Sequence, residues 1–134
     1  MVVEHPDNGD VMAFERSDLP GEWQLPQGGL ERDEEPVDAA WRELGEETGL
    51  GPAEVKLVRE HPRWVAYEWP PEVREKRRGQ VQRWFFYRAI DASVQPTVDR
   101  REFGAWRWCT PDWLLRQVVE FRREAYAEGL GLGS

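Results

Sequence analysis

The segment that decides the fold of this chain, residues 42–50, reads Arg42-Glu43-Leu44-Gly45-Glu46-Glu47-Thr48-Gly49-Leu50. At about 100° per residue, its three glutamates lie within about 100° of one another on a single helix face. Like charges one turn apart destabilise a helix by about 0.2–0.5 kcal/mol per pair, and an interior glycine by about 1 kcal/mol. A bound divalent cation would offset that repulsion, because carboxylate oxygens suit Mg²⁺ or Mn²⁺.

A second interpretation of the same segment is a solvated acidic helix without a ligand. Arg42 is placed to pair with Glu46 one helical turn on. Zinc is not expected in either case, because His5 and His61 stand alone and no His/Cys cluster accompanies them.

Outward from this segment, a helix is expected over residues 36–48. Pro36 can occupy its first turn, and Gly49 can end it. A second helix is expected over 110–128, led by Thr110 and a proline. Strands are expected over 1–5, 10–15, 23–26, 55–61, 63–69, 81–90 and 102–109, with a hairpin turn at Asn8-Gly9 and a basic loop at 70–78. This order predicts an α/β sandwich, with one helix on each face of the sheet.

Length and composition limit the remaining possibilities. The 134 residues suit one domain, expected over 1–128, with a flexible C-terminal tail over 129–134. The net charge of −8 argues against a broad grip on nucleic acid. No apolar run approaches a membrane span, and the first residues lack a signal-peptide pattern, so a cytoplasmic protein is expected. Cys109 has no partner for a disulfide within the chain and is expected to be a packing residue.

A longer pattern surrounds the helix. Gly28 is followed after five residues by Glu34, and after seven more by the segment Arg42–Leu50. This matches the box G-x₅-E-x₇-R-E-U-x-E-E-x-G-U, where U is aliphatic, and a chance match is on the order of one in a million for such a composition. The chain therefore resembles the Nudix hydrolases. The resemblance implies an α/β/α sandwich with a mixed β-sheet between helices, a Mg²⁺ cofactor for which Mn²⁺ can substitute, and hydrolysis of a nucleoside diphosphate linked to another group.

Other segments are similar to one branch of that family, the bacterial RNA pyrophosphohydrolases and the plant-type diadenosine tetraphosphate hydrolases. The likeness lies in Trp23–Gly29, Tyr67–Pro70, Gly79–Phe85, Glu102–Trp108 and Gln117–Tyr126. It implies a pyrophosphohydrolase of 5′-triphosphorylated RNA or dinucleoside polyphosphates. The alternatives are a house-cleaning hydrolase of free nucleoside triphosphates and a noncatalytic nucleotide-binding module.

The resemblance also implies roles for single residues. Arg42 is expected to orient the glutamates by ion pairing, Glu34 to support the loop, and Gly28-Gly29 to let the backbone turn before the helix. Glu102 is expected to approach the metal from a strand, either as a ligand or as a general base. The implied catalytic set is Arg42, Glu43, Glu47 and Glu102, and the implied metal site is Glu43, Glu46, Glu47, Glu102 and Gly28.

The substrate contacts implied by the resemblance come from four parts of the chain. Arg16 is expected to stack on or contact the base, and Tyr67 to meet nucleotide or phosphate. Phe121 and Arg122 match a base-stacking aromatic residue and its basic neighbour, although the apolar stripe of the last helix equally suits Phe121 to the core. Arg77 and Arg78, with the other basic residues of their loop, could hold a polyphosphate or RNA backbone, or could simply be solvated.

The partners implied are a nucleotide or an RNA 5′-end. No membrane and no obligate protein partner are expected, and the chain is expected to be a monomer. Two features depart from the resemblance. The chain begins almost in its first strand, so an arginine that precedes this strand in many relatives is expected to have no counterpart here, and the loop 71–78 is shorter than in many relatives.

Overall fold

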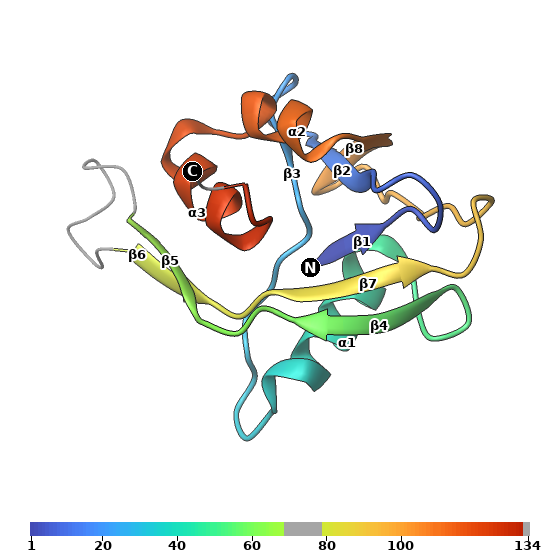
Figure 1. The fold of residues 1–134 in the computed structure, drawn as a ribbon, viewed down its shortest axis with the longest axis horizontal. Coiled ribbons are helices and arrows are strands. Elements are labelled where there is room, and N and C mark those ends of the chain that lie inside the picture. Colours follow the sequence, from blue (N-terminus) through green and yellow to red (C-terminus); the bar gives the residue numbers. More distant parts are fainter. Residues whose placement is uncertain (69–78, 133–134) are drawn as a thin grey trace.

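The computed structural model describes residues 1–68 and 79–132 (Figure 1). Its elements are β1 (Val2–Glu4), β2 (Val11–Arg16), β3 (Trp23–Gln24), α1 (Pro36–Thr48), β4 (Val55–Glu60), β5 (Val65–Glu68), β6 (Gly79–Gln82), β7 (Phe85–Ala89), β8 (Phe103–Cys109), α2 (Pro111–Gln117) and α3 (Glu120–Gly129). Over these residues, no helix has the length and apolar content needed to cross a membrane.

The main sheet is mixed and has six strands. Its order is β3-β2-β1-β7-β4, and β8 pairs with β2. The β1–β7 pair is parallel, whereas the other pairs are antiparallel. Strands β5 and β6 form a separate antiparallel pair beside it (Figure 1).

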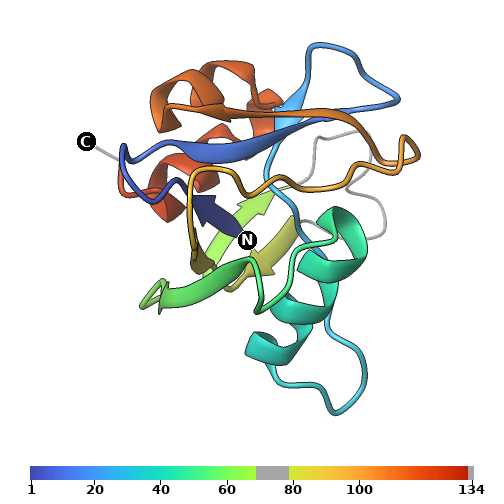
Figure 2. The same cartoon turned by 90° about the vertical axis from the view of Figure 1, so that its right-hand side faces the viewer.

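Alternate side chains of the central strands bury two separate cores, as expected for strands covered on both faces. Val2 packs with the residues of α2 and α3, whereas its neighbour Val3 packs with those of α1. The same alternation divides Ala13 from Phe14 in β2. Figure 2 shows α1 and the α2–α3 pair on opposite sides of the strands. The predicted α/β/α sandwich with a mixed sheet is confirmed.

Two of the local predictions hold at single residues. The Asn8-Gly9 turn joins β1 to the antiparallel β2, with Gly9 at φ 79°. Gly49 ends α1 in the left-handed conformation at φ 73°, where glycine avoids the strain of a side chain. Cys109 is buried in the core beneath α2, as expected of a packing residue, and this burial raises the pKa of its thiol to about 12.

The expected strand 81–90 is wrong, because the structure divides it between two sheets. β6 ends at Gln82 and pairs with β5, whereas β7 begins at Phe85 and pairs with β1 and β4. Trp84 lies between them, buried against Tyr126 of α3, and its carbonyl accepts a hydrogen bond from the His61 amide (2.7 Å). The indole is covered by a helix of the opposite layer, so the strand bends at this residue.

The expected helix 110–128 is also wrong in its middle. Thr110 caps its start as predicted, since the Trp113 amide donates to Thr110 Oγ1 (3.1 Å). The backbone then becomes extended at Val118 (ψ 147°) and Val119 (ψ 139°), which separates α2 from α3. β-Branched residues favour extended backbone, and the turn brings Val118 into the core. α3 includes Gly129, one residue beyond the expected domain boundary at 128.

Gly129 is predicted to be intolerant of a side chain. A Cβ at this position would lie 2.5 Å from the buried, rigid Trp84 indole. We expect Gly129→Ala to lower the free energy of unfolding by about 2 kcal/mol and the melting temperature by roughly 5–10 °C. Thermal denaturation measures this, with Gly45→Ala as the control, because a Cβ at Gly45 meets only the Leu50 carbonyl at 3.8 Å. Equal melting temperatures for the two variants would contradict the packing argument.

Candidate active site

Arg42 of α1 connects the helix to the loop that precedes it. Its Nε and Nη2 donate to the two carboxylate oxygens of Glu34 (2.8 and 2.9 Å), and Nη2 also donates to the Gly29 carbonyl (2.8 Å). These bonds hold the pKa of the Glu34 carboxyl at about 2. Arg42 Nη1 donates to Glu43 (2.6 Å) and to Glu46 (3.3 Å). The geometry agrees with the ion-pairing role expected for Arg42 and with the loop-supporting role expected for Glu34.

Gly28 contributes space to the site. Its φ is not positive, and the structure gives this glycine a role in addition to the expected backbone turn. A Cβ at Gly28 would lie 2.0 Å from Cδ of Glu43. The Glu43 side chain therefore occupies the position that a larger residue at 28 would fill, and the glycine determines where this carboxylate lies.

Glu47 and Glu102 meet although they come from distant parts of the sequence. Glu47 lies in the last turn of α1, and Glu102 directly precedes β8. Burial, followed by the neighbouring carboxylate and hydrogen bond of Glu102, raises the pKa of Glu47 to about 8, and the charge of Glu43 adds to this effect. The Glu47 carboxyl therefore favours its protonated form at neutral pH when no cation is bound.

The metal-free protein should lose stability as the pH rises because of Glu47. Its pKa is raised in the folded state, so its contribution to stability is complete below about pH 4.5 and is lost as the pH rises through about 8. We expect the melting temperature of Glu47→Gln in EDTA to exceed that of the wild type by an increasing margin between pH 5 and 9. Differential scanning calorimetry of both proteins tests this. A constant difference over that pH range would contradict the raised pKa.

The chemistry of the donor set suits a hard divalent cation, whereas its arrangement in the described residues does not complete a site. Among the described residues, Glu47 Oε2 is a buried oxygen without a hydrogen-bond donor, and the carboxylates of Glu43 and Glu102 are its charged neighbours. Oxygen donors of this kind suit Mg²⁺. Within residues 1–68 and 79–132, however, no three acidic, histidine or cysteine side chains are arranged so that they could hold a metal ion. Arg42 holds Glu43 and Glu46, so a cation would have to compete for these carboxylates.

A cleft of about 520 Å³ opens beside Glu102. It brings together Arg16 from the end of β2, Glu102, and Arg122 from α3, three of the residues predicted from the sequence. The lining also includes Asp18, Gln24, Gln27 and Arg101, four residues that the sequence analysis did not single out. The similarity of the segment Trp23–Gly29 to the family branch could have indicated Gln24 and Gln27. Asp18 and Arg101 lie outside every segment that carries the resemblance.

Two of the arginines that line the cleft, Arg16 and Arg122, already have partners. Arg16 donates from Nε and Nη2 to the two oxygens of Asp18 (3.0 and 2.8 Å), which fixes its guanidinium plane. Arg122 is buried and donates from Nη1 to Gln24 Oε1 (2.9 Å). Its guanidinium carbon lies 5.2 Å from the centroid of the Phe121 ring. Phe121 is only partly buried and packs against the core, so core packing and base contact both remain compatible with its position.

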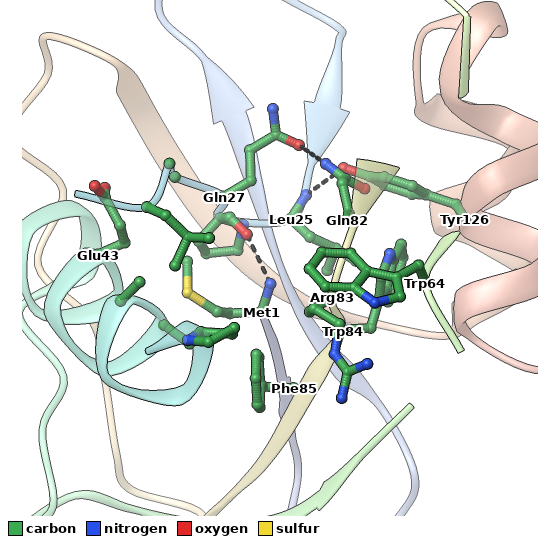
Figure 3. Close-up of a pocket in the computed structure, with 17 residues that line it drawn as sticks. Met1, Leu25, Gln27, Glu43, Trp64, Gln82, Arg83, Trp84, Phe85 and Tyr126 are labelled. Carbon is green, nitrogen blue, oxygen red and sulfur yellow. Dashed lines mark hydrogen bonds between the residues drawn. The ribbon is translucent and has the colours of Figure 1, made fainter. Parts of the chain in front are cut away.

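A second, smaller cavity of about 160 Å³ adjoins the loop before α1 (Figure 3). Glu43 lies at one side of it and Trp64 at the other, and Trp84 and Tyr126 contribute to its aromatic wall. Gln27 lines both cavities and accepts a hydrogen bond from Gln82 Nε2 (2.8 Å). Within the loop from Leu25 to Gly29, Gln27 is therefore the residue common to both linings.

Three predicted contacts lie outside the part of the chain that the structure describes. The side chain of Tyr67 lies outside the described residues, although its backbone belongs to β5. Arg77 and Arg78 lie outside them altogether. The roles expected for these three residues stay predictions.

The chain is similar in sequence to known proteins. A family model described as a NUDIX domain matches residues 1–129. The chain is 41% identical over 128 residues to an RNA pyrophosphohydrolase of Cereibacter sphaeroides, covering 90% of this chain and 79% of that protein. It is 37% identical to the chloroplastic Nudix hydrolase 26 of Arabidopsis thaliana, covering 88% of this chain and 60% of that protein's length.

A solved structure has a similar fold. The structure of the Escherichia coli dihydroneopterin triphosphate pyrophosphohydrolase superposes with a TM-score of 0.77 at 22% identity, covering 98% of this chain and 92% of that one. The box residues, the sandwich and these matches agree. The chain belongs to the Nudix family of hydrolases.

Proposed function

We propose that this chain is a Mg²⁺-dependent pyrophosphohydrolase that cleaves a phosphoanhydride bond of 5′-triphosphorylated RNA or of a dinucleoside polyphosphate. The observation that carries the proposal is the meeting of Glu47 and Glu102, with a buried oxygen of Glu47 unpartnered, next to a cleft lined by three arginines. The relatives named RNA pyrophosphohydrolase support the substrate class. Mn²⁺ is expected to substitute for Mg²⁺.

The carboxylates divide the work in this proposal. Glu43, Glu46, Glu47 and Glu102 would hold the cation, with Gly28 adjoining Glu43. A cation bound there neutralises phosphate oxygens and lowers the pKa of water that attacks phosphorus. Arg42 holds Glu43 and Glu46 in place through its ion pairs. Glu47 or Glu102 would accept the proton of the attacking water, as a carboxylate placed within reach of that water can do.

The cleft would hold the nucleoside part of the substrate. Arg16 and Arg122 present guanidinium groups whose orientation is fixed by Asp18 and Gln24, and such planar groups stack on any base. Phe121 next to Arg122 adds an aromatic face. Tyr67, Arg77 and Arg78 are proposed as further contacts to nucleotide and phosphate. With a net charge of −8, the grip on RNA should be confined to the first few nucleotides.

A product screen tests the proposed function. The purified chain is assayed with Mg²⁺ on triphosphorylated oligonucleotides of graded length, on diadenosine tetraphosphate and on free nucleoside triphosphates, with Glu47→Gln as the inactive control. Cleavage of very short and long RNAs at similar rates, or of the dinucleotide, supports the proposal. Cleavage of free triphosphates alone indicates a house-cleaning enzyme. Rates that rise steadily over tens of nucleotides contradict the confined grip.

A further inference from the structure

The cleft beside Glu102 contains three arginines, but they differ in how their guanidinium groups are used. Arg16 gives two donors to Asp18, and Arg122 is buried with a donor on Gln24. Both groups are thereby fixed in orientation, and the charge of Arg16 is balanced by the carboxylate that it binds. Neither group is well placed to give its full fork of donors to a phosphate.

Arg101 is different. It is exposed and lines the cleft, and among residues 1–68 and 79–132 its guanidinium makes no hydrogen bond or ion pair within 4 Å. The charge of Arg101 acts on Asp99. The pKa of the Asp99 carboxyl is lowered first by a hydrogen bond from the Arg101 backbone amide (2.9 Å) and to a smaller extent by the Arg101 charge. The side chain therefore keeps its donors for a ligand.

The backbone that carries Arg101 is held firmly. Asp99 Oδ1 accepts hydrogen bonds from the amides of Arg101 (2.9 Å) and Glu102 (3.3 Å). The Ser17 amide donates to the Glu102 carbonyl (3.0 Å), and this ties the segment to the end of β2. Arg101 thus starts from a fixed position directly before the carboxylate that meets Glu47.

The negative charge of the site favours a cationic side chain where a polyphosphate chain would approach the carboxylates. The carboxylate of Glu102 lines the cleft together with Arg101, and the glutamates of α1 add negative charge, so the approach of a polyphosphate chain is opposed. A bidentate guanidinium beside these carboxylates binds phosphate oxygens that project into the cleft. We propose that Arg101 is the phosphate-contacting residue of this cleft and that it binds non-bridging oxygens of the polyphosphate between the carboxylates and the base. This inference rests on the proposed function, which it deepens by assigning a specificity-determining residue.

The test is a binding measurement that needs no turnover. A methylene-bridged, non-hydrolysable analogue of diadenosine tetraphosphate is titrated in Mg²⁺ into the wild type and into Arg101→Gln by calorimetry. We expect Arg101→Gln to weaken binding about ten-fold, because it removes a charge-assisted pair of hydrogen bonds. The slope of log Kd against log salt concentration should fall by about one, as for a lost phosphate contact.

Two further variants separate a specific contact from other effects. Arg100→Gln removes the same charge one residue earlier, at a position that does not line the cleft, and should bind like the wild type. Arg101→Lys should recover part of the affinity, since it keeps the charge but loses the fork. Equal weakening by Arg100→Gln and Arg101→Gln, an unchanged salt slope, or a wild type that does not bind the analogue would overturn the inference. Arg101-dependent binding by a protein that cleaves none of the screened substrates would leave it standing and refute the proposed function alone.

Discussion

Replacing Glu47 by glutamine should lower the turnover number by about 10²–10⁴-fold, the range expected when a proton acceptor or metal-holding carboxylate is lost. Glutamine keeps the size of the side chain but removes the charge that Glu102 and Glu43 surround. The fold should be retained, because the buried carboxylate is a source of repulsion in the metal-free protein. Steady-state kinetics in saturating Mg²⁺ measure the loss on whichever substrate the product screen identifies.

The matched control for this variant is Glu35→Gln. Glu35 precedes the same helix, is exposed, and makes no capping hydrogen bond with its side chain. The Glu35→Gln substitution removes one negative charge near α1 but leaves the carboxylate cluster intact. The turnover number of this variant should therefore stay close to that of the wild type. Turnover near the wild-type value in Glu47→Gln would exclude the proposed site.

Gly28→Ala is expected to lower turnover about 100-fold with little change in melting temperature. The added Cβ would lie 2.0 Å from Cδ of Glu43, and the end of this flexible side chain can move aside at little cost to the fold. The displaced carboxylate would leave its place beside Glu47 and lose its hydrogen bond from Arg42. Disturbing the groups that orient such a site typically lowers activity by about 10–100-fold.

Gly29→Ala is the control for that variant, because a Cβ at Gly29 has no atom within 4 Å and its φ is not positive. Turnover and melting temperature are compared for both alanine variants. If Gly29→Ala loses as much activity as Gly28→Ala, loop flexibility rather than the position of Glu43 is the cause. If Gly28→Ala unfolds at a much lower temperature, the glycine serves the fold rather than the carboxylate.

Gly28 and Arg42 show which features of the site can be predicted from neighbouring residues along the chain. The spacing of Gly28, Glu34 and Arg42 indicated a loop and a helix whose arginine pairs with nearby acids, and the contacts of Arg42 agree. The structure adds a reason for the glycine that this spacing did not indicate. The requirement arises from a contact between Gly28 and Glu43, and backbone propensity at position 28 contains no information about it.

The expected strand 81–90 and the expected helix 110–128 are each divided in the structure for a related reason. Trp84 and Val118 each lie in segments whose local pattern suits one continuous strand or helix. Both side chains instead reach the same core beneath α2 and α3, where Trp84 packs against Tyr126. Burial of a large side chain against a distant helix outweighs the weak local preference for continuing an element, and the chain bends so that the side chain can be buried.

By itself, the sequence determined the features that depend on neighbours along the chain. These are the helix 36–48 and its left-handed end at Gly49, the turn at Gly9, and the Thr110 cap. The motif spacing also determined the family, because the box matches at every defined position.

The resemblance implied that Glu102 joins the glutamates of α1, but only the tertiary structure determined how these distant groups meet. The β2–β8 register, with its irregularity between Glu15 and Arg16, brings Glu102 to the end of α1 and beside Glu47. It also brings Arg101 into one cleft with Arg16 and Arg122, and Asp18 closes on Arg16. Strand register is determined by the packing of both sheet faces at once, and a one-residue slip would turn every side chain of β8 to the other face. The charges of the cleft and the raised pKa of Glu47 therefore exist only once the whole sandwich has formed.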